Sequence, residues 1–157
     1  MLAENVKVIT VYSDQDLSAA ATMPGTSIDM SLYHDCLFVV GLQTLGGANP
    51  DFTVYAGATS GATTAKIPFK YALATGAFGG AGASDYSAWT TKDPAGNVTL
   101  AHASDDNKTL LISVDAKSMG GYRYLTLQFE DTPTGSTGNV QAHAILTPRY
   151  KAGVDKA

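Results

Sequence analysis

The chain is poor in charged residues and in the residue types that carry most catalytic chemistry. Only 15% of its 157 residues are charged, and it has three histidines, one tryptophan and one cysteine. A single cysteine excludes an internal disulfide. The net charge is −4 and no basic residues cluster, so we expect no nucleic-acid partner. No apolar run approaches the ~20 residues of a membrane span and the N-terminus lacks a signal-peptide pattern, so we expect no membrane partner and synthesis in a cytoplasm.

The few reactive side chains are not spaced for chemistry. Cys36 lies in an apolar run and is predicted to be a small core residue, although His34 would share a strand face with it. His102 and His143 fall in other predicted segments, without the spacing of paired metal ligands. The turn 105–107 has oxygen ligands for calcium but lacks the EF-hand spacing. We therefore expect no catalytic, cofactor or metal site, and no enzyme.

Strand-like segments make up most of the chain instead. Hydrophobic residues reach 45%, which is too many for a disordered polypeptide. The alternation of side chains is plainest between Tyr122 and Glu130, after a Gly-Gly corner. One face of this segment is predicted to carry Tyr122, Tyr124, Thr126 and Gln128, and the other Arg123, Leu125, Leu127 and Phe129.

About ten segments are predicted as strands, separated by turn clusters at spacings of roughly 8–15 residues. They are Val6–Tyr12, Thr26–Leu32, Leu37–Leu42, Phe52–Ala56, Lys66–Ala72, Tyr86–Thr91, Val98–Ala103, Thr109–Val114, Tyr122–Glu130 and Val140–Leu146. The segment Leu37–Leu42 is apolar on both faces, which predicts a central strand covered on both sides. A longer loop would join it to Phe52–Ala56 in a hairpin. Pro68 places the strand Lys66–Ala72 at a sheet edge.

This pattern predicts an all-β fold, an antiparallel β-sandwich or barrel of Greek-key or jelly-roll type. Little helix is expected beyond one short turn over Leu17–Ala21, which residues 13–16 could cap. A chain of this length fits one domain, which we place at residues 1–149. Residues 150–157 are predicted to form a flexible C-terminal tail.

Aromatic residues and arginines near strand ends are the candidate binding groups. Such residues are enriched at protein interfaces and can also stack on sugars. Two simpler readings compete with binding: Trp89 as a core residue beside a half-buried tyrosine face, and the basic end of the chain as a solvated tail. The candidate interface residues are Tyr122, Arg123, Tyr124, Trp89, Arg149 and Tyr150.

Two segments resemble small all-β virion proteins of tailed bacteriophages, especially head-decoration (cement) proteins. The first, 33–41, is a polar turn leading into a strongly apolar strand. The second, 110–127, joins an aspartate-ended strand, a Met-Gly corner and a Gly-Tyr-Arg-Tyr strand. The resemblance implies a non-enzymatic protein on the capsid surface of the virion, made in the host cytoplasm. Its implied partners are the major capsid protein and further copies of itself, as a trimer at a symmetry axis.

Three other functions stay open on the sequence. The chain could be another tail or connector component of the particle. It could be a carbohydrate-binding or adhesin-like sandwich, in which Trp89, Tyr86, Tyr122 and Tyr124 would form a stacking platform. It could also be a small jelly-roll enzyme, which would require a histidine and a carboxylate in one pocket.

Overall fold

Antiparallel strands dominate the computed structural model, which describes residues 6–94, 96–131 and 135–149. Twelve strands lie in this part of the chain, with one α-helical turn and three 3₁₀ turns. The strands are β1 (Lys7–Asp16), β2 (Thr22–Pro24), β3 (Ile28–Asp29), β4 (Tyr33–Gly47), β5 (Asp51–Gly57), β6 (Ala65–Lys66), β7 (Phe69–Leu73), β8 (Thr90–Lys92), β9 (Val98–Thr99), β10 (Thr109–Asp115), β11 (Tyr124–Glu130) and β12 (Ser136–Pro148). The turns are η2 (Leu17–Ala19), η3 (Met30–Leu32), α1 (His102–Asp105) and η4 (Ala116–Met119).

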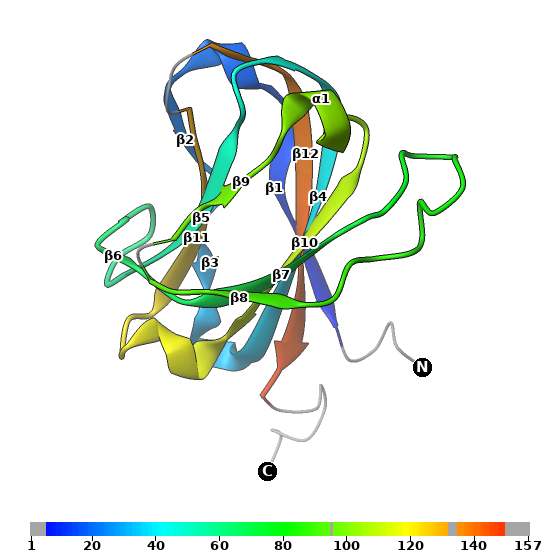
Figure 1. Ribbon diagram of the computed structural model, residues 1–157. Coiled ribbons are helices and arrows are strands. Elements are labelled where there is room, and N and C mark those ends of the chain that lie inside the picture. The colour runs from blue at the N-terminus through cyan, green and yellow to red at the C-terminus, as the bar shows by residue number, and fades with distance from the viewer. Residues whose placement is uncertain (1–5, 95, 132–134, 150–157) are drawn as a thin grey trace.

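The strands form two layers, which we call sheet A and sheet B (Figure 1). Sheet A has the order β1-β12-β4-β10-β7-β8. Sheet B has the path β2-β11-β5-β6, with β3 on β11 and β9 on β5. Successive strands repeatedly change sheet, so the chain is not a simple meander. The predicted all-β antiparallel sandwich with little helix is confirmed.

The core lies between the two sheets and follows the predicted alternation. Leu125, Leu127 and Phe129 of β11 are fully buried, as predicted for that face. The ring of Phe129 packs against that of Phe52 with centroids 5.8 Å apart. Cys36 on β4 is buried in the same core, which confirms its interpretation as a small core residue.

Tyr12 joins the two sheets through its buried hydroxyl. The residue lies on β1 of sheet A, and its Oη donates to the carbonyl oxygen of Met23 (2.6 Å) or Leu127 (3.0 Å) in sheet B. The same oxygen accepts a hydrogen bond from the Phe129 amide at 3.2 Å. Burial raises the pKa of this phenol far above its usual range, so it stays a neutral donor.

The predicted strand pairing needs two corrections. The hairpin of Leu37–Leu42 with Phe52–Ala56 is wrong, because β4 pairs with β12 and β10 while β5 pairs with β11, β6 and β9. The turn after β4 therefore carries the chain across the sandwich instead of back along the same sheet.

The predicted strand Lys66–Ala72 is two strands in different sheets, because β6 ends at Lys66 and β7 begins at Phe69. Pro68 lies between them, where its lack of an N–H does no harm.

Two further predictions concern short elements, one of which is corrected and one of which is confirmed. The predicted strand Val98–Ala103 stops at Thr99, and α1 begins at His102, where the backbone and ring of that histidine contact Asn49 Oδ1. The predicted turn over Leu17–Ala21 is present as η2, capped by Asp16 Oδ1, which accepts from the Ser18 amide at 2.8 Å.

None of the helices in the described ranges is long and apolar enough to cross a membrane. The predicted tail 150–157 lies outside the described residues.

Candidate interaction surfaces

The outer face of sheet A carries a row of apolar side chains across four neighbouring strands. On β4, β10 and β12 the residues on either side of these apolar ones are buried in the core, so the apolar side chains of the row point away from sheet B. Val39 lies opposite Leu111, and Ile145 lies opposite both Leu37 and Val8. Val8 is 60% exposed and the other four are half-buried. We call Val8, Leu37, Val39, Leu111 and Ile145 the apolar stripe.

The segment between β7 and β8 projects from one edge of sheet A (Figure 1). Hydrogen bonds within the segment fix its shape, since the Thr75 amide donates to Asp85 O at 2.8 Å and the Gly76 amide to Gly82 O at 3.0 Å. A third bond, from the Phe78 amide to Asn107 O at 2.7 Å, ties the segment to the loop before β10.

The projecting segment presents aromatic side chains to solvent. Trp89 directly precedes β8 and is 50% exposed, so its interpretation as a core residue is wrong. Tyr86 and Phe78 are also exposed. The Phe78 ring lies 3.4 Å from where a Cβ of Gly41 would stand, which places this ring over the outer face of sheet A. These side chains therefore extend the apolar character of the face toward the β8 edge.

A second surface lies at the end of the sandwich where η3 and η4 meet. It is a pocket of about 280 Å³ lined by Met30, Ser31, Ala116, Met119, Gly121, Tyr122, Arg123 and Arg149. Arg123 and Arg149 are the two arginines of the chain. The fold thus brings together three of the predicted interface residues, the neighbours Tyr122 and Arg123 and the distant Arg149. We call this surface the arginine pocket.

The two arginines of this pocket are held differently. Arg123 Nε donates to both carboxylate oxygens of Asp29 at 3.0 Å, and this pairing holds the pKa of that carboxyl well below its usual range. The Arg123 guanidinium also lies over the Tyr124 ring, 5.4 Å from its centroid. Arg149 Nε donates to the carbonyl oxygen of Tyr33 at 2.9 Å. Within the described ranges no carboxylate forms an ion pair with Arg149.

The predicted common face of Tyr122 and Tyr124 is not formed. Gly120 and Gly121 have φ of +60° and +88°, so the chain turns there and β11 begins only at Tyr124. Tyr122 packs against the core, while Tyr124 belongs to the outer side of sheet B. Trp89 lies apart from both, at the edge of sheet A, and Tyr150 lies outside the described residues. The four-ring stacking platform is therefore not assembled within one described chain.

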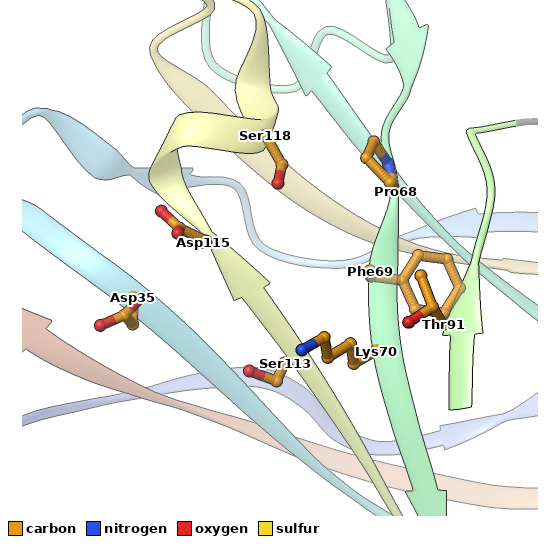
Figure 2. A pocket seen from close by; sticks show the side chains of 8 residues that line it. All are labelled: Asp35, Pro68, Phe69, Lys70, Thr91, Ser113, Asp115 and Ser118. Atoms are coloured by element: carbon orange, nitrogen blue, oxygen red, sulfur yellow. The ribbon is translucent and has the colours of Figure 1, made fainter. Parts of the chain in front are cut away.

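A third surface is a polar pocket of about 190 Å³ on the outer side of sheet A, near η4 (Figure 2). Its lining residues are Asp35, Pro68, Phe69, Lys70, Thr91, Ser113, Asp115 and Ser118. Asp35 and Asp115 are direct cross-strand neighbours, and Asp115 Oδ1 also accepts from the Lys117 amide at 2.9 Å. Lys70 is the cation of this pocket, but it makes no ion pair within 4.0 Å in the described structure. We call Asp35 and Asp115 the acidic pair.

The outer face of sheet B is polar and internally bonded. Glu130 lies at its centre, where Oε1 accepts from the Tyr55 hydroxyl at 2.6 Å and Oε2 from Lys66 Nζ at 3.3 Å. Asn97 Nδ2 donates to the same Oε2 and Thr53 is bonded to Asn97 Oδ1. Burial works against the charge of Glu130, but these donors outweigh it and the pKa of the carboxyl falls below its usual value.

This network predicts a pH-dependent contribution to stability. Because the pKa of Glu130 is lower in the folded chain, its stabilisation is present at neutral pH and is lost as the pH falls below the usual glutamate value of about 4.3. At pH 7 we expect E130Q to be less stable than wild type by about 1 kcal/mol, the typical worth of such a contact. Urea unfolding at pH 7 and pH 3 measures this, and the gap should narrow at pH 3. An unchanged gap would contradict the assigned role of Glu130.

The remaining reactive residues have ordinary partners. His143 and Asp14 line one shallow pocket, yet Asp14 Oδ1 accepts from Asn139 and the His143 ring contacts Thr10 Oγ1 at 3.5 Å. His34 is exposed on β4. In the turn considered for calcium, Asp106 Oδ1 accepts from the Leu45 amide at 2.7 Å. In the residues that the structure describes, no three His, Cys, Asp or Glu side chains form a metal-binding group.

Comparison with known proteins finds one similar solved structure. No protein-family model matches the sequence, and no curated protein matches it. The chain is similar to the crystal structure of the SPBc2 prophage-derived protein YomS, with 12% sequence identity and a TM-score of 0.44. The match covers 90% of this chain and 92% of that protein.

Proposed function

We propose that this protein is a non-enzymatic structural component of a phage particle that binds and stabilises the outer surface of the capsid as a decoration protein. The observation that supports this most is the apolar stripe. Sheet B covers one face of sheet A, and the opposite face offers five apolar side chains, Val8 exposed and the other four half-buried, over which no second sheet lies in the described part of the chain. Contiguous exposed apolar surface of this kind is typical of a protein-binding face.

The partner of this face is proposed to be the major capsid protein. Binding would cover Val39 and Leu111 on the two central strands of sheet A, and the exposed rings of Trp89 and Phe78 would extend the contact toward the β8 edge. Large rings at the edge of such a face are common anchors of protein interfaces. Because several copies can attach to one particle, and a trimer attaches through three such faces at once, modest contacts suffice for stable attachment.

Pelleting with particles tests this function. Purified protein is mixed with capsids of the phage that encodes it, stripped of the native protein, and the particles are collected by centrifugation. The proposal predicts saturable co-pelleting and a higher melting temperature of the loaded capsids. Protein that stays in the supernatant at all concentrations would refute the proposed attachment.

A carbohydrate-binding function is the second candidate, supported by one observation. Trp89 and Tyr86 are exposed on the same projecting segment, with the small polar residues Ser84 and Ser87 close in sequence. Exposed rings of this kind can stack on sugar faces. A glycan array distinguishes the two functions, because a decoration protein should give no hit that depends on Trp89.

A further inference from the structure

The arginine pocket and the polar pocket that holds the acidic pair carry net charges of opposite sign on one chain. Arg123 is neutralised by Asp29, so Arg149 supplies the excess positive charge of its pocket. In the polar pocket two carboxylates face each other across β4 and β10 with Lys70 as the lining cation. Like charges directly opposite each other on a sheet are destabilising, and a cation brought by another molecule would relieve that repulsion.

The two surfaces also match in their apolar parts. Leu32 stands beside Arg149, whose amide donates to its carbonyl oxygen at 2.8 Å, and 61% of the Leu32 surface is exposed. Beside the acidic pair lies the half-buried side chain of Pro68, which lines the same pocket. Leu32 beside Arg149 can thus pack on the apolar surface beside the acidic pair when the arginine faces the carboxylates.

The two surfaces lie on opposite sides of η4. Ala116 and Met119 of this turn line the arginine pocket, whereas Ser118 and the capping residue Asp115 line the polar pocket. Both surfaces are therefore available on one copy, each to a different neighbour. Contacts between unlike surfaces are heterologous, and such contacts close into a ring when the rotation allows.

We infer that copies of this chain bind one another by placing Leu32 and Arg149 of one copy against the acidic pair of the next. This inference rests on the proposed function for the expectation that three copies close the ring. The contact itself follows from the charges and apolar side chains of the two surfaces, and it adds the residues through which copies meet.

Charge exchange in solution, without particles, tests the contact. Light scattering and sedimentation measure self-association of wild type, R149D, D35R and the double variant R149D/D35R. Each single variant places like charges together and is expected to weaken association at least about tenfold. The double variant exchanges the two charges, so it should regain association to within about threefold of wild type. D85R, the same substitution at an exposed aspartate of the projecting segment between β7 and β8, which does not line the polar pocket, serves as the matched control.

The outcomes separate this contact from the proposed function. A wild type that is monomeric at all concentrations, a double variant that stays as weak as the single ones, or a D85R variant as weak as D35R would overturn the contact. A self-associating protein that fails to pellet with capsids would reject the proposed function while the contact stands. A monomeric protein that pellets with capsids would reject the contact between copies while the proposed function stands.

Discussion

Replacing Leu111 with lysine is expected to weaken binding to capsids by at least about 30-fold, which corresponds to the ~2 kcal/mol of a hot-spot residue. Leu111 belongs to the apolar stripe and lies on β10, one of the two central strands of sheet A, directly opposite Val39 on β4. In the complex its side chain would be desolvated, so an ammonium group there would have to be buried without a partner. Titration of capsids with labelled protein measures the loss.

Thr99→Lys is the matched control for that variant. Thr99 is exposed on β9 of sheet B, so the same charge is added to the opposite side of the sandwich. T99K should bind capsids as wild type does, and both variants should unfold at similar urea concentrations, because a long lysine side chain can reach solvent from the half-buried position of Leu111 as well as from the exposed position of Thr99. Equal loss of binding in the two variants would show that added charge, and not the apolar stripe, is responsible.

Replacing Phe129 with alanine is expected to lower the free energy of unfolding by about 3–5 kcal/mol. The Phe129 side chain is fully buried on β11 and packs against Phe52. Truncation removes its contacts and leaves a cavity between the sheets, which a rigid sandwich cannot fill by local movement. Urea unfolding monitored by circular dichroism measures the change.

Phe78→Ala is the control that makes the same chemical change outside the core. Phe78 is exposed on the projecting segment, so its removal should cost less than about 1 kcal/mol. The difference between the two variants then reports burial alone. If F78A destabilises the chain as much as F129A, the projecting segment is part of the cooperative core and its side chains are not free to bind a partner.

The strands could largely be predicted from the sequence because period-two alternation is a local property. Leu125, Leu127 and Phe129 point into the core as the alternation predicts, and η2 follows its capping aspartate. Alternation does not state which sheet a strand joins, however. The hairpin prediction for β4 and β5 failed for that reason, because a turn after a strand can lead back along the sheet or across the sandwich.

The sequence also predicted that the run 37–42 is covered on both sides, and only one side is covered within the described chain. The core of the folded chain therefore does not explain why Leu37 and Val39, which point to the outer side of sheet A, are apolar. The apolar pattern predicts a cover on both sides of the strand, but it does not state which molecule supplies the second one. The proposed function assigns this layer to the capsid.

The interface residues could be predicted only by type. Tyr122, Arg123 and Arg149 meet at one pocket because η4 and the end of β12 lie together, which needs the full topology. The sequence leaves Trp89 open between a core residue and an interface residue, and the bonded projecting segment holds it outside the sandwich.

Electron cryo-microscopy of the phage particle tests the central claim most directly. We expect density for this sandwich on the outside of the capsid, with the outer face of sheet A against capsid subunits and Leu111 and Val39 covered. Density with that face turned to solvent, or particles that contain no copy of the chain, would contradict it.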